Sequence, residues 1–403
     1  MHRLALSGLL CPVLLALLLA PTTARGHDGS LYGVQPFSEG GEFAGGATTY
    51  GLILAEDGSN LWTCVETIGA TPFWWHRVSG ERIVVGTNQG IRISEDGGCS
   101  WSVPAGLAGE LTSFSVAARP GVPQELIATT GAAEAANHVL RSEDGGLTWA
   151  SVFEVAEAGI WRAVWDATGT ELIAEVVHGD GRTVLYRSQD GGASWSATLL
   201  DLGDWRSIGL FGPSLDGQSL WLTALSPEGE FVLGRVAWTL DGALEVLRAF
   251  PNLITAFVEE EDSLHLVIYF SDYMTWTGLA QDEPILSEVG IGPCLYGLDG
   301  LLWGCGGEPM NAQFSRRSAA GDWQEVIRIA DIEPRSCPEA TLGAEVCPAE
   351  WLLVQEALNP TDPPGDDDDD SSDCSGCESA GSPSLALLLL VLPLRFRRQR
   401  VSA

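Results

Sequence analysis

Three stretches of this 403-residue chain repeat one pattern: Ser94-Glu-Asp-Gly-Gly-Cys-Ser-Trp101, Ser142-Glu-Asp-Gly-Gly-Leu-Thr-Trp149 and Ser188-Gln-Asp-Gly-Gly-Ala-Ser-Trp195. Their aspartates are 48 and 46 residues apart. Short alternating or apolar segments precede and follow each stretch, which predicts a turn between two antiparallel strands. A pattern that recurs at a nearly fixed period indicates a repeat architecture, in which each repeat is one small structural unit.

The residue types in this pattern suit a tight turn. The aspartate can accept hydrogen bonds from backbone N–H groups that the bend leaves unpaired, and the glycines can adopt conformations that a side chain forbids. The tryptophan can pack as a large apolar plug between neighbouring sheets. The pattern resembles the Asp-box, also called the bacterial neuraminidase repeat (BNR). This resemblance implies an architectural rather than a catalytic role for the positions Ser94, Asp96, Gly98, Trp101, Ser142, Asp144, Gly146, Trp149, Ser188, Asp190, Gly192 and Trp195.

Weaker copies extend the series in both directions. Turn-like segments occur around Asp57, Asp241, Asp282 and Asp322, so that seven turns follow one another at a mean spacing of about 44 residues. A period of this size with about four short strands per unit is typical of a β-propeller blade. We therefore predict an all-β fold, a β-propeller of seven four-stranded blades over residues 30–335, with six or eight blades as the margin.

The sequence leaves open which strand completes the first blade, and a further segment follows the last blade. The strand that completes the first blade could come from residues 45–53 or from residues 325–330. Residues 336–358 are predicted to hold a disulfide loop and then a short helix over 349–358, with apolar residues spaced three to four apart. We expect this helix to pack beneath the propeller. No helical pattern falls between the strands, which argues against a parallel βαβ sheet.

Both ends of the chain look like processing signals. Residues 1–24 have a basic start, an apolar run and small residues before a cut site, which predicts a signal peptide; the alternative is a retained membrane anchor. Residues 359–373 are acidic and proline-rich, so we expect a disordered linker.

The last segment, 374–403, joins Cys374-Ser-Gly-Cys377 to a short apolar run and four arginines. It resembles the MYXO-CTERM sorting signal of myxobacterial surface proteins. The resemblance implies a sorting protease, contact with the membrane through the tail, display at the cell surface or outer membrane, and lipid attachment at Cys374 or Cys377. The alternative is an ordinary C-terminal anchor.

Eight cysteines remain when Cys11 of the predicted signal peptide is set aside, and an even number favours disulfides in an exported chain. Cys294 and Cys305 flank a predicted hairpin with Asp299-Gly300 near its centre, so they can face each other across two strands. For the others we expect local bridges, with other local connectivities left open: Cys64 with Cys99 between adjacent blades, and Cys337 with Cys347 around a small loop.

The charge of the chain excludes one class of partner. It has 54 acidic and 21 basic residues, all of the latter arginine, for a net charge of −33, which opposes binding to nucleic acid phosphates. The six histidines show no metal-ligand spacing, and the single C-x-x-C lacks a second pair. Phosphate-loop, dinucleotide and nucleophile-elbow motifs are absent from the sequence. We expect no metal and no cofactor.

Another repeated feature points to binding. Tryptophan and arginine lie together where three predicted blades open, on or just before the innermost strand that lines a propeller channel. Such pairs can stack on sugar rings or hold carboxylates through the planar guanidinium. The alternative is that the tryptophans pack between blades while the arginines neutralise acidic neighbours. The candidate binding residues are His76, Arg77, Trp161, Arg162, Trp205 and Arg206.

These observations predict a monomeric, non-catalytic binding or adhesion module with an unknown surface glycan or protein as ligand. The Asp-box resemblance keeps a rival open, because such propellers include sialidases and other glycoside hydrolases. A sialidase needs an arginine cluster, a tyrosine nucleophile tuned by a glutamate, and an aspartic acid. The Phe/Tyr-Arg-Ile-Pro segment of that family is absent, and none of the six tyrosines has a distinctive setting. We therefore name no catalytic residue.

Overall fold

The fold was analysed in a computed structural model that describes residues 33–358, with gaps at 40–41, 108–111, 132–135, 157, 179–182, 199–205, 251, 269–271, 278–284, 288–293, 299, 306–311 and 319–320. The predicted signal peptide, the acidic linker and the tail with Cys374 and Cys377 lie outside the described residues. Among the described residues, no helix has the length and apolar character that crossing a membrane requires.

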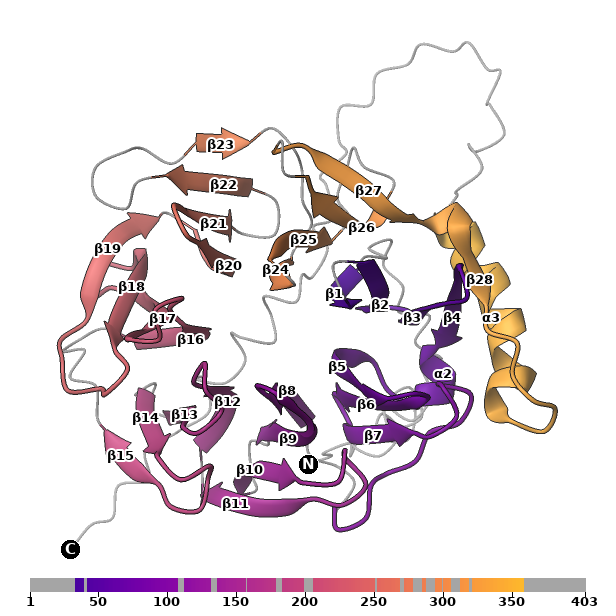
Figure 1. The fold of residues 1–403 in the computed structure, drawn as a ribbon, viewed down its shortest axis with the longest axis horizontal. Helices are drawn as coiled ribbons and strands as arrows, with labels where there is room; N and C mark the ends of the chain where they lie inside the picture. Colours follow the sequence, from indigo (N-terminus) through magenta and orange to yellow (C-terminus); the bar gives the residue numbers. More distant parts are fainter. Residues whose placement is uncertain are drawn as a thin grey trace, which may run out of the picture.

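Seven sheets are arranged in a ring, and we number them blades 1–7 in chain order (Figure 1). Blade 1 contains β1 (Gly33–Glu39), β2 (Glu42–Thr48), β3 (Gly51–Glu56) and β4 (Ser59–Cys64), with β28 (Ile332–Pro334) added at its outer edge. Blade 2 contains β5 (Pro72–Ser79), β6 (Arg82–Thr87) and β7 (Gly90–Ser94). Blade 3 contains β8 (Thr112–Arg119), β9 (Val122–Gly131), β10 (Asn137–Ser142) and β11 (Ala150–Val155).

The second half of the ring continues the same order. Blade 4 contains β12 (Ala158–Trp165), β13 (Leu172–His178), β14 (Thr183–Ser188) and β15 (Ser196–Thr198). Blade 5 contains β16 (Arg206–Pro213), β17 (Ser219–Leu225), β18 (Phe231–Ala237) and β19 (Glu245–Phe250). Blade 6 contains β20 (Ile254–Glu260), β21 (Ser263–Ile268), β22 (Asp272–Thr277) and β23 (Ile285–Ser287), and blade 7 contains β24 (Leu295–Leu298), β25 (Leu301–Cys305), β26 (Ala312–Arg317) and β27 (Trp323–Arg328).

This arrangement is the predicted β-propeller, and the first strand of each blade faces the centre of the ring (Figure 1). The predicted turns follow the third strand of each blade, except that Asp282 is outside the described residues. The segment 45–53 does belong to the first blade, as β2 and β3, whereas 325–330 falls in blade 7 and the following 3-10 turn, Ile329–Asp331.

Blade 2 departs from the predicted four strands, because its described part has only three. The chain after Trp101 pairs with β7 once, where Ile93 and Ser102 exchange two hydrogen bonds of 2.9 Å each. If the antiparallel pairing continued, Ile91 would lie opposite Pro104. Proline has no N–H, so it cannot donate to the Ile91 carbonyl. The Arg92 guanidinium donates to the Ile91 carbonyl instead, at 3.1 Å. Proline therefore ends the fourth strand after a single pair.

The three repeated loops at 94–101, 142–149 and 188–195, which we call the Ser-Asp-Trp loops, share one hydrogen-bond pattern. In the second loop, Asp144 Oδ1 accepts from the Thr148 N–H at 2.9 Å and from the Ser142 hydroxyl at 2.8 Å. The Trp149 Nε1–H donates to the Gly146 carbonyl at 3.0 Å. Gly146 has a φ of 87°, which a residue with a side chain rarely adopts. The same contacts recur in the other two loops, so the predicted turn chemistry is confirmed.

The tryptophans of these loops fill the spaces between neighbouring blades, as predicted. Trp149 is 6% exposed and belongs to a cluster that joins Val84 and Ile93 of blade 2 to Leu126 of blade 3. Trp101 packs against the cluster between blades 1 and 2, and Trp195 against the one between blades 3 and 4. Much of the apolar core therefore lies between sheets, which fixes each blade against the next.

The ring closes where blade 1 meets blade 7. Trp62 of blade 1, Phe314 and Ile327 of blade 7, and Trp351 from the final helix share one apolar cluster. Strand β28 runs parallel to β4, with Ile332 opposite Asn60. The described C-terminal residues therefore complete the seam that the first and last blades leave between them.

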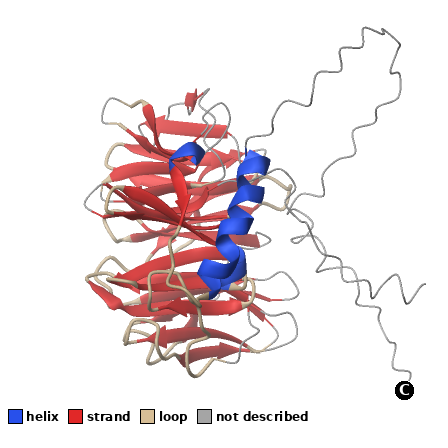
Figure 2. Ribbon diagram, turned by 90° about the vertical axis from the view of Figure 1, so that its right-hand side faces the viewer, coloured by secondary structure: helices blue, strands red, loops and turns tan. Residues whose placement is uncertain are grey.

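The final helix differs from its prediction in length and place. Helix α3 (Leu342–Leu358) begins before Ala349 because the Thr341 hydroxyl accepts from the Ala344 N–H at 3.4 Å, which caps the first turn. The helix lies along the outer surface of the ring rather than beneath it (Figure 2). It packs there against β4 and the short helix α2 (Val65–Ile68).

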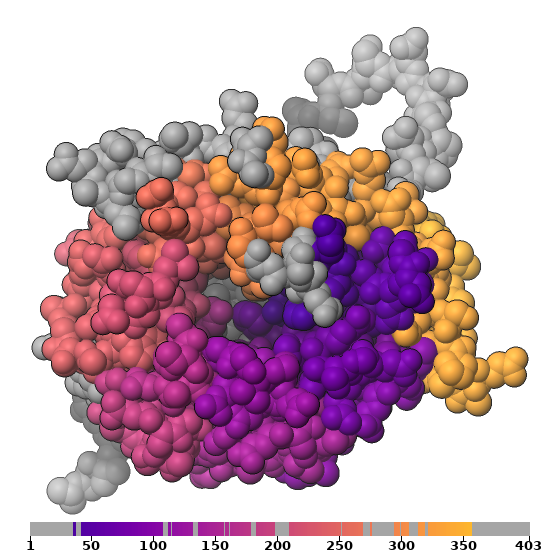
Figure 3. All heavy atoms as spheres, viewed as in Figure 1, coloured from indigo at the N-terminus to yellow at the C-terminus, as the bar shows by residue number. Residues whose placement is uncertain are grey.

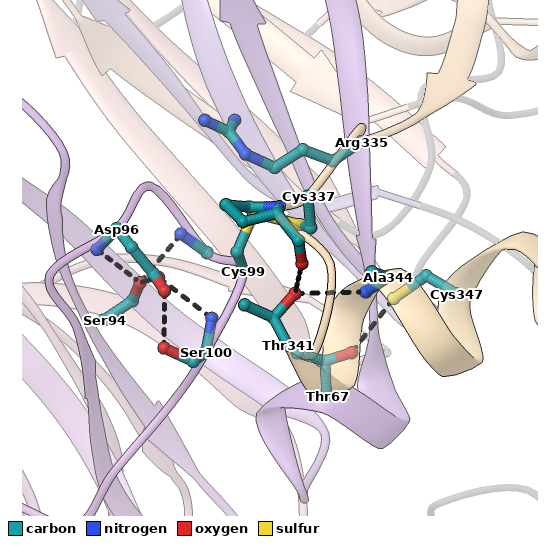
Figure 4. Close-up of a disulfide and its surroundings, with 12 residues drawn as sticks. Thr67, Ser94, Asp96, Cys99, Ser100, Arg335, Cys337, Thr341, Ala344 and Cys347 are labelled. Atoms are coloured by element: carbon teal, nitrogen blue, oxygen red, sulfur yellow. Dashed lines mark hydrogen bonds between the residues drawn. A yellow bond between two sulfur atoms is a disulfide. The ribbon is translucent and has the colours of Figure 1, made fainter.

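One of the predicted disulfides is confirmed, and two pairings are wrong. Cys294 pairs with Cys305 across the hairpin. The other bridges join Cys64 to Cys347 and Cys99 to Cys337, instead of Cys64 to Cys99 and Cys337 to Cys347. Figure 4 shows the bridge between Cys99 and Cys337. The prediction paired cysteines with neighbours along the chain. Ring closure brings the C-terminal segment onto blades 1 and 2, so the partners are far apart in sequence.

Candidate functional site

Of the predicted binding residues, Arg162 is the one whose described side chain lies toward the central channel. It is on β12, the innermost strand of blade 4, and its Nη1 donates to the Leu210 carbonyl of blade 5 at 2.8 Å. Its guanidinium carbon lies 5.3 Å from the ring centre of Trp74 on β5, a cation–π contact between blades 2 and 4. Figure 3 shows the molecule hollowed at the centre, where the innermost strands meet.

A shared backbone irregularity places Arg162 and Trp74 at corresponding positions. The register of β12 against β13 shifts between Ile160 and Arg162, and that of β5 against β6 shifts between Pro72 and Trp74. A bulge of this kind inserts one residue and re-aims the side chains that follow it. The two blades therefore present their tryptophan and arginine from the same point of the repeat.

Other predicted binding residues serve contacts between blades. The Nε2 of His76 lies 3.2 Å from the Pro123 carbonyl, and burial lowers the pKa of this imidazole, although the Pro123 contact opposes the shift. Arg77 forms an ion pair with Glu56 at 3.1 Å. Trp205 lies outside the described residues, and the side chains of Trp161 and Arg206 are not among those described. A continuous Trp-Arg face remains a prediction.

Tyr296 and Glu175 accompany Arg162 in what we call the channel cluster. Glu175, 1% exposed, accepts from the Leu210 N–H at 3.1 Å. Burial raises the pKa of the Tyr296 phenol to about 12, although the charge of Arg162 opposes the shift. Burial also lowers the pKa of the Arg162 guanidinium, which Tyr296 and Glu175 oppose. The cluster thus joins an arginine, a neutral phenol and a carboxylate.

A second feature, which we call the hairpin pocket, is a cavity of about 800 Å³. It is open to solvent, and the turns that join the first two strands of blades 5, 6 and 7 line it. Because strand direction alternates, these turns lie on the same face of the ring as the Ser-Asp-Trp loops. Phe211, Trp221 and Phe257 form an aromatic wall, with ring centres 5.3 Å apart for the two phenylalanines and 4.8 Å for Trp221 and Phe257.

The pocket also has an acidic part, because four consecutive acidic residues, Glu259–Asp262, belong to its lining. Glu259 Oε2 accepts from the Trp221 Nε1–H at 2.8 Å and from the Leu215 N–H at 2.9 Å, which holds the carboxylate against the aromatic wall. Glu260 lies 2.9 Å from His265 and 3.9 Å from Arg317. Glu261 and Asp262 are exposed at the tip of the turn. Two carboxylates are therefore held in place, and two face solvent.

Ser263 and Glu260 of the pocket lining contact the fully buried His265 beneath it, but not in the geometry of a hydrolase triad. The Ser263 hydroxyl and the Glu260 carboxylate both approach Nε2 of His265, each at 2.9 Å. A triad needs the nucleophile on one ring nitrogen and the acid on the other. Nδ1 of His265 instead lies 3.4 Å from the Thr275 hydroxyl. Burial lowers the pKa of His265, although Glu260 opposes the shift.

The sequence prediction did not include the hairpin pocket. A run of four acidic residues at a strand end was the available signal, but the chain is acidic throughout and one more run does not stand out. Nothing in the sequence indicated that turns from three blades would converge on it. Within the described part of the chain, no group of three or more His, Cys, Asp or Glu side chains is placed to hold a metal ion.

The similarity of this chain to known proteins is confined to structure. No protein-family model matches it, and no curated protein matches it. Among similar solved structures are the GH74 xyloglucanase from Xanthomonas campestris, with a TM-score of 0.52 and 14% identity over 74% of this chain and 55% of that chain, and the GH74 enzyme of Niastella koreensis, with 0.52 and 13% over 74% and 55%. A prolyl endopeptidase structure has a TM-score of 0.51 at 9% identity, over 73% and 49%. This chain spans about half of each, and the likeness shows the propeller fold alone.

Proposed function

We propose that this protein is an exported, monomeric binding or adhesion module that holds its ligand in the hairpin pocket. The observation that carries the proposal is the cavity of about 800 Å³ between blades 5, 6 and 7, which both aromatic rings and a run of carboxylates line. Its volume is in the range of ligand-binding clefts. Because Ser263, His265 and Glu260 lack triad geometry, we assign the pocket side chains to binding and orienting a ligand.

The lining selects the ligand by its chemistry. Phe211 and Phe257 are partly exposed and offer apolar faces to a sugar ring or to a cationic group. Glu261 and Asp262 accept hydrogen bonds from hydroxyl groups and attract positive charge. A surface glycan or a basic segment of a protein can both pack on the aromatic rings and bind the carboxylates. An anionic ligand would be repelled by the four carboxylates.

The setting of this module is part of the same proposal. The Ser-Asp-Trp loops support an Asp-box propeller of the BNR type. The two ends of the chain support export, sorting by a MYXO-CTERM-like signal, and display at the cell surface through the membrane. Three disulfides among the described residues suit an oxidising location.

The proposal is tested by binding, not by stability. Retention of the purified protein is measured on an array that carries cell-envelope glycans and arginine- or lysine-containing peptides. We expect Phe257→Ala and Glu261→Gln each to weaken retention on the same probes by at least about tenfold, a change of roughly 1.4 kcal/mol. The matched control is Glu228→Gln, which removes an exposed carboxylate from the turn between β17 and β18. Wild-type retention by both pocket variants would contradict the proposal.

The channel cluster favours a second candidate, a secreted glycoside hydrolase of the sialidase-like type. It brings an arginine, a tyrosine and a glutamate together, three of the residue types that such an enzyme uses. A pKa of about 12 nevertheless keeps the Tyr296 phenol neutral, and a neutral phenol is a poor nucleophile. Hydrolysis of fluorogenic glycosides that Tyr296→Phe abolishes would establish this candidate over the binding module.

A further inference from the structure

The C-terminal segment 332–358, which we call the clasp, lies across the seam of the ring. Its strand β28 extends blade 1, and the Arg335 N–H donates to the Trp62 carbonyl at 2.8 Å. Asn60 Nδ2 donates to the Asp331 carbonyl just before the clasp, at 3.3 Å. In α3, the Trp351 ring lies 5.0 Å from that of Trp62. The clasp therefore covers the outer edge of the blade that the first strands of the chain form.

Elsewhere in the ring, arginines of one blade hold the turn of the next. Arg141 of blade 3 donates to the Gly191 carbonyl of blade 4 at 3.1 Å and to Glu125 at 2.6 Å. Arg187 of blade 4 donates to the Thr239 carbonyl of blade 5 at 3.4 Å and pairs with a glutamate of its own blade. Each contact joins an ion pair within a blade to a turn of the neighbour.

At blade 1 the corresponding arginine comes from the clasp. Arg335 pairs with Glu56 of blade 1 at 2.9 Å, and its side chain is 10% exposed. Its guanidinium packs on Gly97, in the Ser-Asp-Trp loop of blade 2, so closely that an added Cβ there would lie 2.5 Å from Nη2. The clasp thus supplies a contact between blades 1 and 2 that other blades make from their own strands.

Two disulfides attach the clasp to these same blades. Cys347 in α3 is bonded to Cys64 at the end of β4, and Cys337 is bonded to Cys99 in the Ser-Asp-Trp loop of blade 2. Figure 4 shows the second bridge beside the loop of Asp96. The bonded residues are 283 and 238 positions apart, against 11 for the hairpin bridge. Bridges of such separation constrain the unfolded chain far more than a local one.

We propose that the clasp is a redox-sensitive lock on the ring: reduction of Cys64–Cys347 and Cys99–Cys337 frees residues 332–358 from blades 1 and 2 and exposes the edge of β4 that β28 covers. Each bridge takes two electrons and two protons from a dithiol, which becomes a disulfide, and yields two cysteine thiols. Without the bridges, the main contacts that still hold the clasp are one short parallel strand, one ion pair and the packing of the helix. Either bridge alone already ties the chain ends, so release requires both.

The test uses trypsin on the purified, oxidised full chain. The protein has no lysine, so trypsin cuts only after arginines, and the Arg335–Ser336 bond reports on the clasp. With dithiothreitol we expect this bond to be cut at least about tenfold faster, and β4 amides to lose protection from hydrogen exchange. Equal cutting rates with both bridges shown reduced by mass spectrometry would overturn the proposal.

Two variants separate the clasp from other effects of reduction. Cys294→Ala with Cys305→Ala removes the hairpin bridge and should leave the dithiol response unchanged. Replacing Cys64, Cys99, Cys337 and Cys347 by alanine should give fast cutting without dithiol. If this fourfold variant does not fold, the reduction of folded wild-type protein still tests the proposal, because that protein has folded with its bridges before dithiothreitol is added.

Discussion

Blades 2–4 and blades 5–7 build similar sheets with different turns. The three Ser-Asp-Trp loops lie in the first group and share their aspartate, glycine and tryptophan contacts. In blade 5 the corresponding turn keeps a bond of 2.6 Å from the Thr239 hydroxyl to Asp241, but places Leu240 at a φ of 60°. The hairpin pocket lies in the second group. Repetition thus marks the scaffold, and the candidate ligand site lies where the repeat has been lost.

The difference has a physical reason. A loop that satisfies its own backbone and plugs the neighbouring blade tolerates few substitutions, because each residue has a partner. The turns around the pocket carry no such pattern, and Glu261 and Asp262 at the tip of one of them face solvent, where they can meet a ligand. The following predictions test this contrast, from the largest expected effect to the smallest.

The largest effect is expected from the tryptophan plug. Trp149→Ala should lower the free energy of unfolding by about 3–5 kcal/mol, because it leaves a cavity between blades 2 and 3. The comparison variant is Trp323→Ala in blade 7, where the indole is only partly buried and a smaller loss follows. Equilibrium urea unfolding followed by circular dichroism measures both. Equal losses would remove the contrast between the two groups of blades.

A smaller effect is expected from the turn aspartates. Asp144→Asn should lower the free energy of unfolding by about 1–3 kcal/mol, since an amide has one acceptor oxygen where the carboxylate uses two. Asp241→Asn, in the exposed turn of blade 5, should change it by less than about 0.5 kcal/mol. Urea unfolding followed by circular dichroism measures both variants. A loss of unfolding free energy in Asp241→Asn as large as in Asp144→Asn would contradict the prediction.

The smallest effect is a dependence on pH. Hydrogen bonds from the Ser194 hydroxyl and N–H and from Ser188 lower the pKa of Asp190 to about 2. A folded pKa below the unfolded value of about 3.9 means that stability is present above pH 4 and is lost as pH falls toward 2. Unfolding titrations at pH 5, 3.5 and 2.5 should show this loss, reduced in Asp190→Asn. An unchanged slope in that variant would exclude Asp190 as a source.

The sequence carried different amounts of information about different parts of the molecule. In the Ser-Asp-Trp loops, the aspartate bonds to backbone N–H groups and the packing of the tryptophans between blades were predictable, because a tight turn is decided by residues within eight positions of one another. The bonds from Ser142 to Asp144 and from Trp149 to Gly146 were not predicted. The hairpin bridge Cys294–Cys305 was predictable because its two residues are also close in sequence. The partners of Cys64 and Cys99 were not, because they depend on where the chain ends meet.

By itself the sequence determined the repeat, and with it the turns and the propeller, since the spacing of acid, glycine and indole is a local property that recurs. Only the tertiary structure decided how the ring is closed and where the hairpin pocket lies. Closure joins Cys64 to Cys347, and the pocket joins Phe211 to Phe257 and to the turn of blade 7. Such contacts are set by the curvature and packing of whole blades, which no short stretch of residues encodes.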